Sequence, residues 1–226
     1  MMLRKYSHFS NNGLEVFLTE NHSCWSSDID SRRSQILNYS KKNKLIMPHQ
    51  VHGDKVVVVS ESFDDVECDA IVYKNSLDLV GAINVADCVP ICMYDDISGY
   101  IALVHSGWRG TLKKIVVKTL NEMLRLGSSR KSIKVFIGPS IRGCCYEVES
   151  FFASKFYSTS VIKKTNKFYV DITSNILRDL KRELIPRNNI FIDMSCTFED
   201  SKLHSYRRDL NNSGRMSLVA YMKENG

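Results

Sequence analysis

The most informative segment for the fold class is Val80-Gly-Ala-Ile-Asn-Val-Ala-Asp-Cys-Val-Pro-Ile-Cys-Met-Tyr-Asp-Asp-Ile-Ser-Gly-Tyr-Ile-Ala-Leu-Val104. It contains three strand-like runs, Val80 to Val85, Val89 to Tyr94 and Tyr100 to Val104, with only short turns between them. A doubly wound parallel sheet needs a crossover helix between successive strands, and no helical pattern interrupts this stretch. The stretch therefore predicts an α/β protein with a mixed sheet, or stacked mixed sheets, and helices on the outside.

Patterns of apolar residues predict further strands and helices on both sides of Val80 to Val104. Further strands are expected at Leu14 to Leu18, Lys55 to Val59, Ala70 to Tyr73, Ile133 to Ile137, Ile190 to Asp193 and Met216 to Tyr221. Helical spacing is found at Asp30 to Lys42, Thr111 to Leu126, Glu149 to Tyr157 and Thr173 to Glu183. No repeat, low-complexity tract or Pro/Ser-rich linker interrupts the 226 residues, so residues 1–226 are expected to form a single domain.

The overall composition limits the possible partners. No apolar run reaches the roughly 18 residues of a membrane span, and Met1 to Ser10 lacks a signal-peptide pattern, so we expect a cytoplasmic protein without membrane contact. The net charge of +6 is spread over the chain without a basic block or interleaved aromatic and basic residues. Nucleic-acid binding is therefore a weak hypothesis, because a small anionic substrate accounts for the charge equally well. The sequence leaves the oligomeric state open.

Seven cysteines are scattered along the chain, an odd number that does not suggest a disulfide framework. We expect most of them to be free, buried thiols in a reducing compartment. Cys144 and Cys145 are neighbours, which places them poorly for chelating one metal together, and we expect them to pack near Tyr146 and Glu147 at a loop. Cys196 follows an expected strand, where a structural use is favoured.

Three reactive residues lie at or near predicted strand boundaries. His105 ends the strand from Tyr100 and precedes a turn with Gly107 and Gly110, Cys88 lies between two strands, and His52 precedes the strand from Lys55. If these boundaries meet at one edge, they gather two imidazoles and a thiolate. Such a trio suits zinc with one open position, and it also describes a blue-copper site. Without a metal, a histidine could deprotonate Cys88 for nucleophilic attack; a structural role for all three residues is the other alternative.

Five motifs follow one another between Leu45 and Tyr221. They are His49-Gln-Val-His-Gly53, Ala86-Asp-Cys-Val-Pro90, His105-Ser-Gly-Trp-Arg-Gly110, Gly138-Pro-Ser-Ile-Arg-Gly-Cys-Cys-Tyr-Glu-Val148, and Cys196-Thr followed by His204-Ser-Tyr-Arg-Arg-Asp209 and Gly214-Arg215. In this order they resemble the motifs of the laccase-domain family, long labelled polyphenol oxidase and later associated with purine nucleoside phosphorylase activity.

The resemblance implies a fold, a metal and a reaction. The fold would be one domain of stacked mixed β-sheets flanked by helices, in αββα layers, similar to cysteine-hydrolase-like toxin catalytic domains. The metal, usually described as zinc, would be bound by His52, Cys88 and His105. The reactions would be phosphorolysis of adenosine, inosine, guanosine and methylthioadenosine, and deamination of adenosine at the same site. The chain departs from the family where a Gly-rich segment is usual, since Phe17 to Ser26 looks shortened there.

The remaining motif residues suggest substrate contacts. Arg109 beside the helix start, and Arg207 or Arg208, are candidates for gripping phosphate with a planar guanidinium, although surface salt bridges would also explain the last two. Asp87 either acts in catalysis, moving a proton or orienting a histidine, or caps a turn. Trp108 and Tyr206 either stack on a purine base or are simply buried aromatic residues.

The laccase label conflicts with the histidine count. A multicopper centre needs on the order of ten histidines, whereas this chain has six and no His-x-His pair. Copper in the His/His/Cys site remains possible for weak oxidase activity. We expect a zinc-dependent purine nucleoside phosphorylase with adenosine deaminase activity. The alternatives are a Cys88 hydrolase that edits peptidoglycan precursors, a copper-binding polyphenol oxidase and a non-catalytic metal-binding protein.

Overall fold

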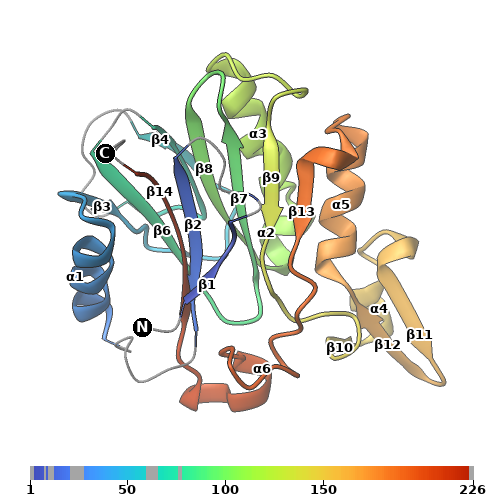
Figure 1. Ribbon diagram of the computed structural model, residues 1–226. Helices are drawn as coiled ribbons and strands as arrows, with labels where there is room; N and C mark the ends of the chain where they lie inside the picture. The colour runs from blue at the N-terminus through green and yellow to red at the C-terminus, as the bar shows by residue number, and fades with distance from the viewer. Residues whose placement is uncertain are drawn as a thin grey trace.

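Two stacked β-sheets with helices on both outer faces make up the molecule (Figure 1). The computed structural model describes residues 3–7, 9, 13–20, 28–59, 66–75 and 78–223. The smaller of the stacked sheets has the strand order β1-β2-β14-β6-β3. Its strands are β1 (Leu3–Lys5), β2 (Leu14–Thr19), β14 (Met216–Met222), β6 (Leu79–Val85) and β3 (Lys44–Ile46). Only the β3–β6 pair is parallel in this sheet.

The larger sheet has the order β13-β9-β7-β8-β5-β4 and is also mixed. Its central pairs, β9–β7, β7–β8 and β8–β5, are antiparallel, while β13–β9 and β4–β5 at the edges are parallel. Its strands are β13 (Ile190–Ile192), β9 (Lys134–Ile137), β7 (Val89–Asp95), β8 (Tyr100–Ser106), β5 (Ala70–Lys74) and β4 (Val56–Val59).

Helices cover the outer face of each sheet. Helix α1 (Ile29–Ser40) packs through Ile36 on the smaller sheet. On the larger sheet lie α3 (Ile115–Arg125) and α5 (Ile172–Arg182), whose apolar residues share one core with the strands. The short helices are α2 (Trp108–Leu112), α4 (Ser150–Ala153) and α6 (Tyr206–Asp209), and a small side sheet contains β10 (Glu147–Val148), β11 (Val161–Lys164) and β12 (Lys167–Val170).

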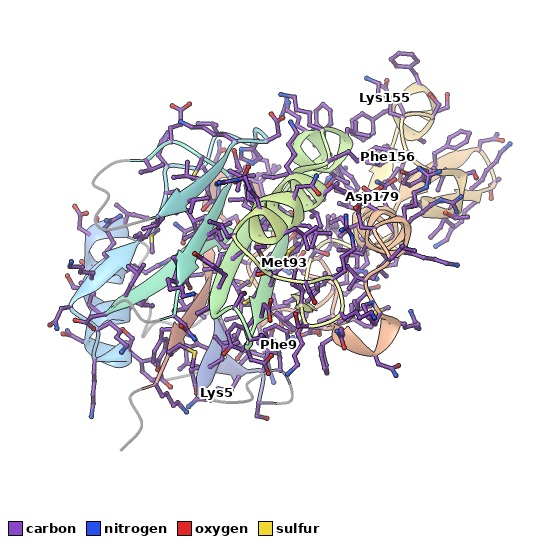
Figure 2. The ribbon with its side chains drawn as sticks, turned by 90° about the horizontal axis from the view of Figure 1, so that it is seen from above. Lys5, Phe9, Met93, Lys155, Phe156 and Asp179 are labelled. Atoms are coloured by element: carbon purple, nitrogen blue, oxygen red, sulfur yellow. The ribbon has the colours of Figure 1, made fainter. Side chains whose placement is uncertain are left out.

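Strand alternation assigns side chains of the larger sheet to two separate cores. On β8, Ile101 and Leu103 face the smaller sheet, while Ala102 and Val104 face the helices. Met93 belongs to the core beneath the helices and Phe9 to the core between the sheets, and both are labelled in Figure 2. The αββα arrangement is confirmed, and the doubly wound alternative is excluded.

The nine expected strands are all present, with ends displaced by one or two residues, but two helix expectations were wrong in extent. The helix expected at Thr111 to Leu126 is two helices, because Lys114 adopts a left-handed conformation with φ 63°, which a right-handed helix cannot contain. The segment Glu149 to Tyr157 contains only the single turn α4 before the chain leaves the helical path. Within the described ranges, no helix is long and apolar enough to cross a membrane.

The N-terminal departure from the family pattern is only partly visible. Residues 17–19 belong to β2, whereas residues 21–27, which include Cys24, lie outside the described residues.

Candidate functional site

The site lies where connections between the two stacked sheets meet. The segment from β3 to β4 carries His52, the turn from β6 to β7 carries Asp87 and Cys88, and the segment from β13 to β14 carries helix α6. The β6–β7 turn and α6 lie at the same end of the sheets in Figure 1. His105 lies near the end of β8, on the face that points toward the smaller sheet.

His52, Cys88 and His105 come together as the strand boundaries predict. One imidazole nitrogen from each histidine and Sγ of Cys88 all lie within 4.8 Å of one another. The two imidazole rings meet edge to face at 82°, with centroids 4.8 Å apart. His105 is 3% exposed, Cys88 is partly buried and His52 is exposed, so the cluster has a closed and an open side.

Unusual backbone positions and one small residue make this convergence possible. His52 and Asp87 both have positive φ, 57° and 82°, which turns the chain sharply at two of the three connections. Gly107 provides space: a Cβ there would lie 3.0 Å from Sγ of Cys88 and 3.3 Å from Cδ2 of His52. Any side chain at position 107 would therefore crowd Cys88 and His52.

Asp69 is the site residue that sequence reasoning missed. It lies opposite His105 beside the β5–β8 ladder, is fully buried, and its Oδ1 is 2.7 Å from Nδ1 of His105. The same carboxylate accepts hydrogen bonds from the backbone N–H groups of His52 at 3.0 Å and Gly53 at 2.6 Å. The available signal was an acidic residue directly before the apolar run Ala70 to Tyr73, but only the strand register pairs it with His105.

These contacts set the charges of the cluster. Burial disfavours the thiolate of Cys88, but hydrogen bonds and charge from His105 and His52 outweigh burial and lower the pKa of Cys88 to about 7. Burial likewise disfavours the imidazolium of His105, but Asp69 and Cys88 raise the pKa of His105 to about 9. Burial raises the pKa of Asp69, whereas the hydrogen bond from His105 lowers it. The pKa of Asp69 is lowered overall. At neutral pH the metal-free cluster therefore holds Cys88 close to the midpoint between thiol and thiolate, beside a protonated His105.

The cluster meets the requirements of a zinc centre. It offers two nitrogen donors and one thiolate sulfur at compatible separations, with the exposed side left for a further ligand. Asp69 holds Nδ1 of His105, which fixes the orientation of the ring and leaves the other nitrogen for a metal. The residues present therefore fit the metal that the sequence motifs imply, while the same donor types do not distinguish zinc from copper.

Asp87 has both carboxylate oxygens in use. Oδ1 accepts a hydrogen bond from the Thr197 hydroxyl at 2.6 Å, and Oδ2 accepts one from the backbone N–H of Arg207 at 2.6 Å. Asp87 thereby ties the Cys88 turn to the segments around Thr197 and α6. This geometry favours the capping alternative for Asp87.

A groove of about 1190 Å³ opens in front of the three donor residues. Positively charged side chains predominate among its charged residues, which are Arg33, Arg109, Arg207 and Arg215 with Asp30 and Asp87. The aromatic residues of the lining are Trp108, Tyr146 and Tyr206. The groove therefore offers cationic and aromatic surfaces next to the cluster.

The three arginines singled out from the sequence have different surroundings. The guanidinium of Arg109 lies 4.3 Å from the ring centroid of Trp108, and that of Arg207 lies 5.2 Å from the ring centroid of Tyr146; both residues line the groove. Arg208 is outside that lining. Its guanidinium donates to the backbone carbonyls of Thr197 and Leu203, both at 2.8 Å, and so organises the loop before α6.

Comparison with known proteins places the chain in a family. Residues 25–223 match the family described as multi-copper polyphenol oxidoreductase laccase. A purine nucleoside phosphorylase of Clostridium acetobutylicum is 37% identical over 175 residues, covering 74% of this chain and 72% of that protein. An adenosine deaminase from an unknown prokaryotic organism is 33% identical over 198 residues, covering 79% and 75%. The chain belongs to this laccase-like family.

Solved structures agree on the fold. YlmD from Geobacillus stearothermophilus superimposes with a TM-score of 0.84 at 21% identity, covering 94% of this chain and 93% of that one. The Bacillus licheniformis hypothetical protein YfiH gives a TM-score of 0.83 at 22% identity.

Proposed function

We propose that this chain is a cytoplasmic purine nucleoside phosphorylase that also deaminates adenosine. The observation that carries the proposal is the placement of His52, Cys88 and His105 in a groove lined by arginine and aromatic side chains. Relatives at 37% and 33% identity bear the names of these two activities. The substrates would be a nucleoside and inorganic phosphate, and one groove has room for both.

Zinc is the proposed metal, with His52, Cys88 and His105 as its protein ligands. When bound, it supplies Lewis acidity beside the substrate. Asp69 keeps His105 oriented for this task, and Asp87 keeps the Cys88 turn in place. Copper in the same donor set is the alternative.

In phosphorolysis, the groove arginines would bind the attacking phosphate. The bond between ribose C1′ and the purine nitrogen breaks with its electron pair leaving on the base, and a phosphate oxygen forms the new bond to C1′. The transition state is cationic at the sugar, by analogy with glycoside hydrolysis. Arg109 and Arg207 can hold the phosphate against this centre with guanidinium N–H donors. Tyr206, 48% exposed in the groove, offers a face for the purine.

Deamination uses the same groove with water in place of phosphate. Water adds to the purine carbon that bears the amino group, ammonia leaves, and a proton must move from the water oxygen to the departing nitrogen. The proposal assigns Asp87 a structural task instead, because its two oxygens hold the Thr197 hydroxyl and the backbone N–H of Arg207.

The test is chromatography of adenosine and inosine after incubation with purified protein, with and without phosphate. We expect adenine and hypoxanthine only when phosphate is present, together with an equal amount of ribose 1-phosphate, and inosine from adenosine without phosphate. The Cys88→Ala variant should abolish both reactions. Intact nucleosides in the presence of metal-loaded protein would reject the proposal.

A second candidate function rests on a specific contact. Asp69, His105 and Cys88 form a carboxylate–imidazole–thiol series in which the pKa of Cys88 is lowered to about 7, an arrangement suited to a nucleophilic thiol. A hydrolase of this kind, acting on a peptidoglycan precursor, would keep its activity in a chelator and lose it on thiol alkylation. The phosphorylase should lose activity in the chelator and regain it when zinc is restored.

A further inference from the structure

A second cluster of thiols lies outside the groove. Sγ of Cys144, Cys145 and Cys196 and a carboxylate oxygen of Glu199 all lie within 4.8 Å of one another. Sγ of Cys144 is 3.2 Å from Sγ of Cys145 and 3.5 Å from Oε2 of Glu199. None of these residues lines the groove that contains Cys88.

The expectation that Cys144 and Cys145 pack at a loop, poorly placed for chelating one metal together, does not account for this arrangement. The tight turn at Arg142 directs both thiols to one side: the N–H groups of Cys145 and Tyr146 both donate to the Arg142 carbonyl at 2.9 Å. Cys196, distant in sequence, then supplies the third thiol. The sequence could not show this contact, because it depends on two turns meeting after β9 and β13 have paired.

The two turns are held together by backbone bonds. Thr197 donates its N–H to the Ser140 carbonyl at 3.1 Å, within an isolated parallel bridge between Ser140 and Cys196. On the other turn, Asp200 donates its N–H to the Cys196 carbonyl at 2.9 Å, which directs Glu199 back toward the thiols. The backbone therefore holds the two turns that carry these four side chains next to each other.

Three thiols and one carboxylate match the donor preferences of a thiophilic divalent cation. Sulfur ligands at about 2.3 Å from a tetrahedral zinc lie about 3.8 Å apart, a spacing between the 3.2 Å that separates Sγ of Cys144 from Sγ of Cys145 and the 4.8 Å limit of the cluster. Cys196 is 6% exposed, whereas Cys144 and Glu199 are exposed, so the cluster is anchored on a buried side and open on another for entry of an ion. Zinc sites in which the protein supplies all four ligands are structural rather than catalytic, because no coordination position is left for a substrate.

We propose that Cys144, Cys145, Cys196 and Glu199 form a second, structural zinc site. The ion would join the turn after β9 to the turn after β13. The hydroxyl of Thr197, the residue after Cys196, donates to Asp87, so the same ion would also brace the turn that carries Cys88. The proposal is independent of the reaction catalysed in the groove.

The test uses the Cys88→Ala variant, in which the groove cluster has lost its thiolate. Reduced protein is loaded with Co²⁺ and then with Zn²⁺, and bound metal is counted by mass spectrometry after gel filtration. We expect about one equivalent of tightly bound metal and a thiolate-to-cobalt absorption band that zinc removes. The unmodified protein should hold one equivalent more than Cys88→Ala.

Matched variants made in the Cys88→Ala protein assign the ligands. Cys144→Ser combined with Cys145→Ser should remove the remaining metal and the absorption band. Glu199→Gln, an exposed substitution that spares the fold, should weaken zinc affinity by about tenfold or more, and Glu147→Gln, at a nearby exposed carboxylate that pairs with Lys167, should not. Absence of tight metal and of the band in folded Cys88→Ala protein would overturn the proposal, as would a disulfide joining two of the three cysteines in the protein as isolated.

Discussion

Asp69 shows how much of the site depends on a residue that binds no ligand itself. Its buried carboxylate accepts hydrogen bonds from the backbone N–H groups of His52 and Gly53 and also orients His105. Asp69 therefore positions two of the three donor residues. We expect Asp69→Asn to weaken zinc binding by about 10- to 100-fold, as loss of a carboxylate partner of a metal-binding histidine does. Competition with a chromophoric chelator measures this directly. Unchanged affinity in a folded variant would contradict the role assigned to Asp69.

Gly107 allows a second prediction at the scale of one residue. Its φ of −74° suits any residue, so alanine causes no backbone strain there. The new Cβ would instead press on Sγ of Cys88 and the ring of His52. We expect Gly107→Ala to reduce zinc affinity and nucleoside turnover together, with a much smaller change in the denaturation midpoint. A variant that binds zinc normally would show that the cluster accommodates the methyl group.

The substrate contacts proposed for the groove are also tested residue by residue. Removing Arg109 would take away the proposed charge-assisted hydrogen bond to phosphate, worth about 1.5–3 kcal/mol, equivalent to about 10- to 100-fold. Arg109→Ala should therefore raise the KM for phosphate by that factor and leave adenosine deamination, which uses no phosphate, little affected. Arg125→Ala, on the exposed end of α3, is the control. Equal loss of both activities would indicate a structural role for Arg109.

At the scale of secondary-structure elements, the joint between α2 and α3 is fixed by an ion pair. Nζ of Lys114 lies 2.8 and 3.1 Å from the two carboxylate oxygens of Asp179, whose side chain is 5% exposed on α5. Lys114→Met would leave that carboxylate without its cation and should lower the free energy of unfolding by about 1–3 kcal/mol. The neighbouring Lys113→Met removes only a surface pair with Asp54 and should change stability by less than about 0.5 kcal/mol. Urea denaturation of both variants provides the comparison.

The elements that sequence patterns predicted are those with a strong apolar periodicity. All nine expected strands form, because each buries one or both faces in a core. The strands that were missed are short or rich in lysine, such as β11 (Val161–Lys164) and β10 (Glu147–Val148), and their pairing depends on neighbours rather than on pattern. The break at Lys114 was hidden because apolar spacing continues across it; the contact with Asp179 is long-range.

The sequence could predict those residues of the site that lie at the ends of strands. His52, Cys88 and His105 carry reactive groups at strand boundaries, and those boundaries do meet. Asp69 and the cluster of Cys144 and Cys196 were not predicted, because each depends on which strands become neighbours. Residue type alone therefore indicates the chemistry of a donor, while sheet order decides which donors share a site.

At the scale of the whole molecule, Arg4 links the N-terminal strand to the opposite sheet. Its guanidinium on β1 contacts Glu20 at 3.0 Å, Asp193 at 3.3 Å and Asp200 at 2.9 Å, and all four side chains are less than a third exposed. Arg4→Met should lower the free energy of unfolding at pH 7 by about 1–3 kcal/mol. Arg125→Met, which removes an exposed pair within α3, should have little effect.

The same network predicts a pH dependence. Burial raises the pKa of Asp193 and of Asp200, but hydrogen bonds to Ser195 and Arg4 outweigh it, so both values are lowered on folding. A lowered carboxyl pKa contributes stability that is complete above the unfolded value of about 3.9 and is lost as the pH falls through the folded value. The stability difference between Arg4→Met and the unmodified protein should thus be largest near neutrality and shrink below about pH 4. A constant difference from pH 7 to pH 3 would contradict this account.

The left-handed backbone at His52 also limits how this protein can evolve. Histidine, aspartate and asparagine tolerate positive φ comparatively well, whereas β-branched residues do so poorly. Mutational routes that exchange the donor at position 52 are therefore confined to side chains with nitrogen or oxygen donors, unless the loop itself is remodelled. His105, in an extended strand, is under no such restriction. At position 105 the constraint is instead the buried carboxylate of Asp69, with which any replacement side chain would have to pair.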